Sequence, residues 1–134
     1  MKLPATERIV VVNAVPPAPT FENTIWDAKV LTSMVGDNPA MHRRLLEKFL
    51  LSTTEQVARI VAAAATEDTA TAGNVAHALK SAARTVGALQ LGELCAALET
   101  AGKAGDATRC STLIKELPAT FAGAATAIQC HLAL

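Results

Sequence analysis

Hydrophobic side chains recur at steps of three and four residues from Ile25 to the end of the chain, which is the period of an amphipathic helix. The spacing predicts one short helix followed by four longer ones. They span, in chain order, residues 28–35, 39 to about 65, 69 to about 86, 89 to about 101 and 107 to about 132. The pattern therefore predicts an all-α chain.

The ends of these helices are marked by residues that favour starts and stops. The predicted boundaries are an N-cap at Asp27, a stop at Gly36, an N-cap at Asn38 before Pro39, a break at 67–69, a stop at Gly87, and a turn and cap at Gly105 and Asp106. Pro118 lies inside the last predicted helix. Because proline removes one backbone hydrogen bond, we expect a kink at that residue.

Short connections make neighbouring helices pack antiparallel. The expected fold is an up-and-down antiparallel four-helix bundle with a short additional N-terminal helix. A length of 134 residues suits one domain, and 51% hydrophobic residues supply a core. One Trp, no Tyr and three Phe leave that core to Ala and Leu, which favour helices over sheet.

The first residues of the chain differ from the rest. Residues 16–19 read Pro-Pro-Ala-Pro, a stiff stretch that cannot continue a helix. We interpret residues 1–20 as a Pro-rich linker or tail and residues 21–134 as the folded domain. Residues 9–12, which read Ile-Val-Val-Val, leave a second interpretation open, in which these side chains dock on the bundle.

Composition argues against several classes of function. The net charge is zero, so no basic surface is available to neutralise a nucleic-acid backbone. Three scattered cysteines fit a reducing compartment, and the lack of the usual zinc-ligand spacings between them and the histidines argues against zinc. No apolar run reaches the roughly 20 residues that span a bilayer, and no signal peptide is evident. We expect a cytoplasmic protein, or the cytoplasmic part of a larger membrane-bound one.

The helix predicted at 69–86 carries the most distinctive polar residues. On a wheel of about 100° per residue, one stripe faces the core and comprises Val75, Leu79, Ala82 and Val86. His77 lies on the opposite side, and within about 60° of it lie Lys80, Ser81 and Arg84. This placement makes a core role for His77 implausible and leaves an ordinary surface histidine as the competing interpretation.

A solvent-facing histidine in this setting suits phosphoryl chemistry. A neutral imidazole is nucleophilic, and its nitrogen can carry a phosphoryl group. Lys80, one turn later, can offset the negative charge, and the small Ser81 lets a partner protein approach closely. Arg84 extends the positive patch as a possible contact to a partner or phosphate, although an exposed arginine often serves solubility alone.

The residues from His77 to Ala88 read HALKSAARTVGA, which resembles the signature of histidine phosphotransfer (HPt) domains. In that family the phosphorylated histidine is followed by Lys three places on, a small residue next, and Gly ten places on, here Gly87 at the helix end. Ser81 departs from the Gly that many members have and keeps the site small. The segments 35–39, 45–49 and 94–99 are also similar to the family, so the resemblance covers about residues 25–130.

The resemblance implies a phosphorelay intermediate in two-component signal transduction. His77 would accept a phosphoryl group from the phospho-aspartate of one response-regulator receiver domain and pass it to another. The family has no ATP-binding or kinase site and no cofactor, because the receiver supplies Mg²⁺. The resemblance also points to Glu99, 22 residues after His77, as the acceptor of a hydrogen bond from Nδ1 of His77. Gln90 is a weaker polar candidate near the same end of the helix.

The sequence is compatible with alternatives for both the context and the function of the domain. The Pro-rich leader resembles the linker before the C-terminal HPt module of hybrid sensor histidine kinases. The alternative is a free-standing protein. As an isolated domain, the module is expected to be monomeric. The alternative functions are a structural helical adaptor and a histidine kinase dimerisation and phosphoacceptor domain. The kinase domain usually has an acidic residue directly after the histidine, whereas Ala78 follows His77 here.

Overall fold

Six helices account for most of residues 24–133, the part of the chain that the computed structural model describes. They are α2 (Ala28–Val35), α3 (Pro39–Ala65), α4 (Thr69–Val86), α5 (Leu89–Lys103), α6 (Ala107–Ile114) and α7 (Leu117–Leu132). No strand occurs among these residues. The predicted all-α fold class is confirmed.

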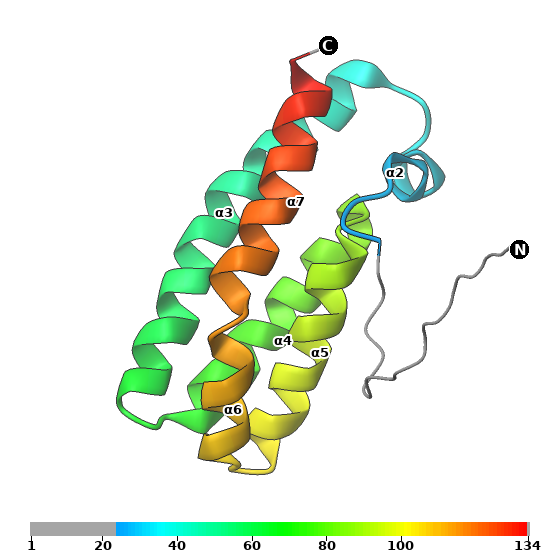
Figure 1. Ribbon diagram of the computed structural model, residues 1–134. Coiled ribbons are helices and arrows are strands. Elements are labelled where there is room, and N and C mark those ends of the chain that lie inside the picture. Colours follow the sequence, from blue (N-terminus) through cyan, green and yellow to red (C-terminus); the bar gives the residue numbers. More distant parts are fainter. Residues whose placement is uncertain (1–23, 134) are drawn as a thin grey trace, which may run out of the picture.

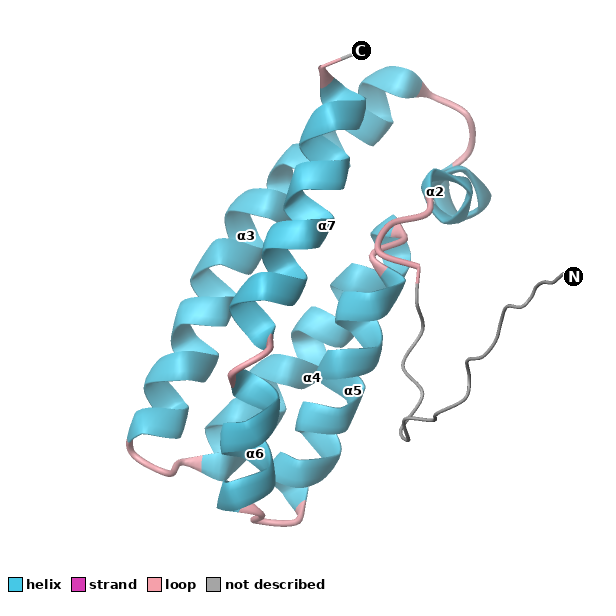
Figure 2. Cartoon of the chain, viewed as in Figure 1, coloured by secondary structure: helices cyan, strands magenta, loops and turns pink. Residues whose placement is uncertain are grey.

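The long helices α3, α4 and α5 and the pair α6–α7 run alternately up and down as a four-helix bundle (Figure 1), with the short α2 at one end. Short loops join them (Figure 2), as the predicted antiparallel topology requires. Within residues 24–133, no helix has both the length and the apolar character to cross a bilayer. Residues 1–20, predicted as a linker or tail, lie outside the described part, so the domain limits of 21–134 stay a prediction.

The predicted helix starts carry side-chain caps. Each capping side chain accepts a hydrogen bond from a backbone N–H in the first turn of its helix, which satisfies a donor that has no partner within the helix. The pairs are Asp27 with Lys29 (2.9 Å), Asn38 with Met41 (3.1 Å), Asp68 with Thr71 (3.1 Å) and Asp106 with Arg109 (3.0 Å). These boundaries are therefore determined by local sequence.

The kink predicted at Pro118 was wrong in form and in place. The helix stops at Ile114, and a new helix begins at Leu117, so the chain is interrupted before the proline is reached. Pro118 then lies in the first turn of α7, where the backbone N–H that it lacks would have no helical partner. A break at this position removes the conflict that a proline inside a continuous helix creates.

The buried face of α4 is rotated relative to the prediction. Ala82, expected in the core, is only half-buried, whereas Ala76 and Ala83 are both fully buried. The other three predicted core residues of this helix are buried, namely Val75, Leu79 and Val86. Because α4 packs against both α3 and α5, its buried arc is wider than one stripe and extends toward α5.

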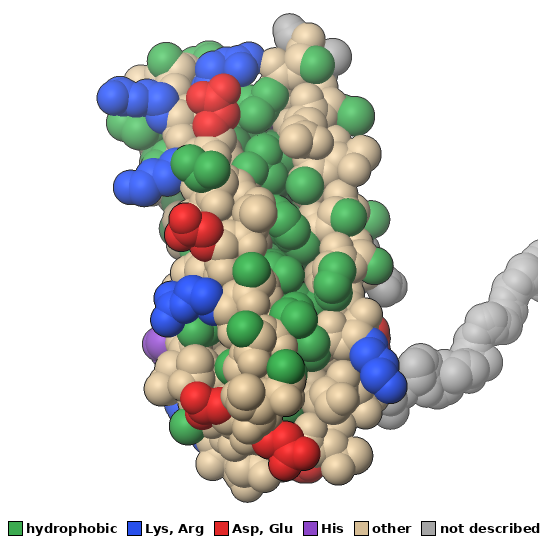
Figure 3. All heavy atoms as spheres, turned by 90° about the vertical axis from the view of Figure 1, so that its left-hand side faces the viewer, with side chains coloured by type: hydrophobic (Ala, Val, Ile, Leu, Met, Phe, Trp, Pro, Cys, Tyr) green, Lys and Arg blue, Asp and Glu red, His purple; other side chains and the backbone are tan. Residues whose placement is uncertain are grey.

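The outer side of α3 leaves one branched hydrophobic side chain exposed. Val61 is 42% exposed, whereas Ala63, two residues later, is buried. The steps of three and four that lead through Ile60 continue to Ala63 and Ala64, so Val61 falls beside the seam. The face of the bundle that includes α3 carries a lengthwise band of hydrophobic side chains (Figure 3).

Thr53 on α3 gives the first testable prediction. It is fully buried, and its hydroxyl has no hydrogen-bond partner among the described residues. Because an unsatisfied buried hydroxyl is costly, Thr53→Val is expected to raise the free energy of unfolding in urea by about 1 kcal/mol. The matched control is Thr54→Val, since Thr54 is exposed and donates to the carbonyl of Leu50 at 2.9 Å. An equal gain from both variants would contradict the explanation.

The helices α4 and α5 meet closely where two glycines face each other. A methyl group built on Gly102 would lie 2.6 Å from the carbonyl oxygen of Thr69 and 2.7 Å from the Cα of Gly73. Such distances are too short for any real side chain, so position 102 requires glycine at this separation, whereas a methyl group on Gly73 would make a tight contact of 3.2 Å with the Cα of Gly102. Gly73 lies one turn before His77, and Gly102 lies one turn after Glu99. The close crossing therefore determines how near those two side chains come.

Gly87 joins α2 to the bundle. Its φ is +94°, in the left-handed region that favours glycine at a helix end. The backbone N–H of Asp27 donates to the carbonyl of Gly87 at 2.8 Å, and the indole Nε1 of Trp26 donates to the carbonyl of Val86 at 2.8 Å. A residue predicted only to end a helix thus also provides the contact that holds the N-terminal helix.

Candidate functional site

His77 projects outward from the middle of α4. Its side chain is 59% exposed, and its neighbours Ala78 and Ser81 are exposed as well. The small side chains beside it leave the ring accessible to a large partner. The fold is thus compatible with the position that the helical wheel predicted, and a ring packed into the core is excluded.

Glu99 on α5 contacts the inner nitrogen of this ring. Glu99 is 6% exposed as a whole residue, and its Oε2 lies 2.7 Å from Nδ1 of His77. Because a carboxylate only accepts hydrogen bonds, Nδ1 carries the proton in this contact. In the neutral imidazole, Nε2 then presents its lone pair, which is the form that a nucleophile needs.

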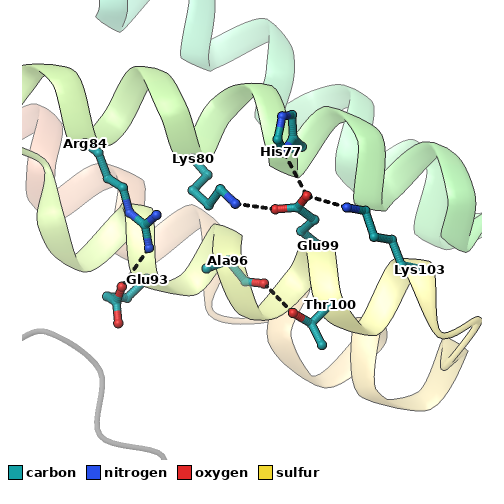
Figure 4. A network of polar contacts seen from close by, with 8 residues as sticks. All are labelled: His77, Lys80, Arg84, Glu93, Ala96, Glu99, Thr100 and Lys103. Carbon is teal, nitrogen blue, oxygen red and sulfur yellow. Dashed lines mark hydrogen bonds and ion pairs between the residues drawn. The ribbon is translucent and has the colours of Figure 1, made fainter.

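Two lysines share the same carboxylate (Figure 4). Nζ of Lys80 donates to Oε1 of Glu99 at 2.6 Å, and Nζ of Lys103 donates to Oε2 at 2.8 Å. Lys80 comes from α4, one turn after His77, whereas Lys103 comes from α5, one turn after Glu99. Glu99 therefore joins the two helices through its contacts with His77 and Lys80, and Lys103 adds a third polar contact from its own helix.

Lys103 was not among the residues predicted from the sequence. The available signal was its spacing of four residues from Glu99, a distance at which opposite charges pair on a helix. That signal is weak by itself, because many solvent-exposed pairs have the same spacing. Only the neighbouring helix shows that the pair belongs to the cluster around His77.

The surroundings of Glu99 favour its ionised form. Hydrogen bonds from Lys103 and Lys80 lower the pKa of the Glu99 carboxyl from its ordinary value of 4.5 to about 2, while burial acts in the opposite direction. The hydrogen bond with His77 contributes to the same lowering of the pKa. At neutral pH the carboxylate is therefore fully charged and available as an acceptor.

This pKa predicts how stability depends on pH. The unfolded chain binds a proton at Glu99 near pH 4.5, and the folded chain binds it only near pH 2. The stabilisation from the ionised carboxylate is therefore present above pH 4.5 and is lost as pH falls toward 2. Urea unfolding of the wild type and Glu99→Gln should show their stability difference shrinking across this window. An equal difference at both ends would contradict the prediction.

Arg84 lies on the same outward side as His77 but has another partner. Its Nη2 donates to Oε2 of Glu93 at 3.0 Å, and both side chains are exposed to more than a third of their surface. An exposed ion pair of this kind contributes little to stability. The predicted contact of Arg84 with a partner or phosphate stays a prediction, and it would compete with Glu93.

Gln90 is not brought to the site. It lies in the first turn of α5, nine residues before Glu99. That separation corresponds to about 13 Å along the helix axis. Its backbone N–H donates to the carbonyl of Thr24, so its position belongs to the N-terminal connection.

A shallow hollow of about 350 Å³ opens between α3 and α4 beside the site. It is lined by Leu45, Lys48, Phe49, Ser52, Ser81, Ala82, Thr85 and Val86. Ser81, one turn after His77, stands on its rim, and the half-buried Ala82 forms part of its wall. Among the described residues, no group of three metal-ligating side chains is close enough together to hold a metal ion.

Comparisons with known proteins agree with this geometry. Residues 44–127, more than half of the chain, match the protein family described as Hpt domain. The chain is also similar to the crystal structure of histidine-containing phosphotransfer protein B (HptB) from Pseudomonas aeruginosa PAO1. That match has a TM-score of 0.74 and 25% identity and covers 86% of this chain and 96% of the other. A comparison with curated protein sequences gives no match. The chain therefore belongs to the histidine phosphotransfer domain family, the phosphotransfer intermediates of phosphorelay signalling.

Proposed function

We propose that His77 is the residue that carries the phosphoryl group. The observation that supports this most directly is the pairing of an exposed ring with a buried carboxylate on its Nδ1 at 2.7 Å. The contact orients the imidazole and leaves Nε2 directed away from Glu99. Neither His42 nor His131 contacts a carboxylate in the described structure.

The proposed step is an in-line transfer from the aspartyl phosphate of a receiver domain. The lone pair on Nε2 of His77 forms a bond to phosphorus while the bond from phosphorus to the aspartate oxygen breaks. The aspartate leaves with the electron pair as a carboxylate, and the imidazole ring becomes positively charged. Glu99 faces that charge through Nδ1–H, and Lys80 stabilises the phosphoryl oxygens. The reverse step passes the group to the next receiver.

The receiver is proposed to bring the Mg²⁺ that this reaction uses, and the module itself is proposed to need no cofactor and to have no ATP-binding site. Receiver docking would use the exposed surface around His77 together with the hollow between α3 and α4. The apolar wall of that hollow, with Leu45, Phe49 and Ala82, suits a protein partner, and the small Ser81 allows its active site to reach the histidine.

Further proposals follow from the sequence. Zero net charge gives no support for nucleic-acid binding, and we propose a cytoplasmic module that is monomeric as an isolated domain. We also propose that residues 21–134 are its folded unit, attached through the Pro-rich residues 16–19 to a preceding part of a hybrid sensor kinase.

The test is a transfer assay with a panel of receiver domains, each phosphorylated with radiolabelled acetyl phosphate and freed of the excess donor. The chain is expected to take up label from at least one receiver in the presence of Mg²⁺. The bond formed should be labile in acid and stable in alkali, as a phosphoramidate is. Absence of uptake from every receiver, or uptake from ATP alone, would overturn the proposal.

A further inference from the structure

Glu99 contacts more positively charged groups than are needed to balance one carboxylate. Two ammonium groups, from Lys80 and Lys103, lie at 2.6 and 2.8 Å from its two oxygens, and His77 lies at 2.7 Å. The carboxylate side chain is 8% exposed, whereas the side chain of Lys103 is 68% exposed. A single lysine would be enough to pair a nearly buried carboxylate, so the second lysine needs an explanation.

The position of Lys80 suggests what the second lysine does. Its side chain is 21% exposed, and its ammonium group donates to Oε1 of Glu99 at 2.6 Å. To stabilise a phosphoryl group on Nε2 of His77, this ammonium must turn from Glu99 toward the phosphoryl oxygens. If Lys80 were the sole cation there, its departure would leave a buried carboxylate without a counter-charge, which is energetically costly.

We propose that Lys103 is a positioning residue for phosphotransfer, which keeps Glu99 paired and in place while Lys80 moves from Glu99 to the transferring phosphoryl group. The proposal rests on the proposed role of His77. Lys103 bonds Oε2, the oxygen that also contacts His77, whereas Lys80 bonds the other oxygen, Oε1. Lys80 can therefore leave without disturbing the hydrogen bond that orients the ring.

The charge balance of the cluster supports this role. Before transfer, two lysines and one carboxylate give a net charge of +1 with a neutral imidazole. The incoming phosphoryl unit brings one net negative charge, because its two negative charges are partly offset by the positive ring. The cluster then becomes neutral. Without Lys103 it would end with a net charge of −1 in a partly buried site, which opposes transfer. Lys103 also contributes most to the lowered pKa of Glu99.

The test compares variants in the receiver transfer assay. Lys103→Gln is expected to lower the maximal transfer rate about tenfold, the effect of losing one charge-assisted contact of about 1.4 kcal/mol. The KM for the phosphorylated receiver should stay unchanged, because Lys103 is not proposed to touch the receiver. Lys103→Arg should restore most of the rate. The matched control is Lys115→Gln, an exposed lysine at the end of α6, which should transfer at the wild-type rate.

A double variant and urea unfolding separate this role from two others. In the background of Glu99→Gln, Lys103→Gln should lower the rate no further, because Lys103 is proposed to act only through the Glu99 carboxylate. A full loss in that background would mean that Lys103 contacts the phosphoryl group or the receiver directly, and would overturn the proposal. A purely structural role would appear as a lower free energy of unfolding in urea with an unchanged rate for folded protein.

The outcomes also distinguish this proposal from the one on which it rests. If the wild type takes up no label from any receiver, the role of His77 fails. If the wild type is labelled and Lys103→Gln transfers at the same rate, only the role of Lys103 fails.

Discussion

His77→Gln is expected to abolish uptake of phosphoryl label from a phosphorylated receiver. Glutamine keeps a polar side chain but has no ring nitrogen with a nucleophilic lone pair, so no phosphoramidate can form. Because the His77 side chain is 59% exposed, the substitution should leave the core intact. Urea unfolding of the variant should therefore give nearly the wild-type midpoint, which shows that lost uptake is not lost folding.

The chain supplies its own controls for this experiment. His42 makes a ring contact with the carbonyl of Gly36 at 2.6 Å, and His131 lies edge-on to Trp26 with ring centroids 5.0 Å apart. Neither is near Glu99 in the bundle, so His42→Gln and His131→Gln should both keep the label. Label retained by His77→Gln, or lost in either control, would place the acceptor elsewhere.

Gly102→Ala is expected to destabilise the bundle by about 2–3 kcal/mol and to slow transfer. The new methyl group would stand 2.6–2.8 Å from backbone atoms of Thr69 and Gly73, which cannot rotate aside. The helices α4 and α5 must therefore separate at their closest crossing. Because His77 and Glu99 lie one turn from this crossing, their hydrogen bond should lengthen, and the imidazole should lose its fixed orientation.

Gly123→Ala is the matched control for that substitution. Gly123 also lies inside a helix, but a methyl group there would meet nothing nearer than a side-chain atom of Ile25 at 3.8 Å. Since alanine favours helix over glycine, this variant should gain up to about 1 kcal/mol. Urea unfolding and the transfer assay check both variants. A neutral result for Gly102→Ala would mean that the two helices tolerate a wider separation.

Much of the fold can be predicted from the sequence because it depends on neighbours along the chain. Caps such as Asp27 and Asn38 satisfy N–H groups two or three residues away, and the apolar period shows that His77 faces outward. The contact of Glu99 with His77, 22 residues earlier, is predicted only by the resemblance to a family, because no local physical rule relates the two positions. Local hydrogen bonds and helical periodicity explain these successes.

The remaining features depend on how helices meet, which no single helix determines. The rotation of α4 that buries Ala83 and leaves Ala82 half-buried follows from its contact with both α3 and α5. The inclusion of Lys103 in the cluster has the same origin. One helix specifies which residues share its face, but the distance between two faces is decided by the side chains, or the glycines, at their crossing. The Gly73–Gly102 approach brings Glu99 within hydrogen-bonding distance of His77, and with it determines the chemistry of the site.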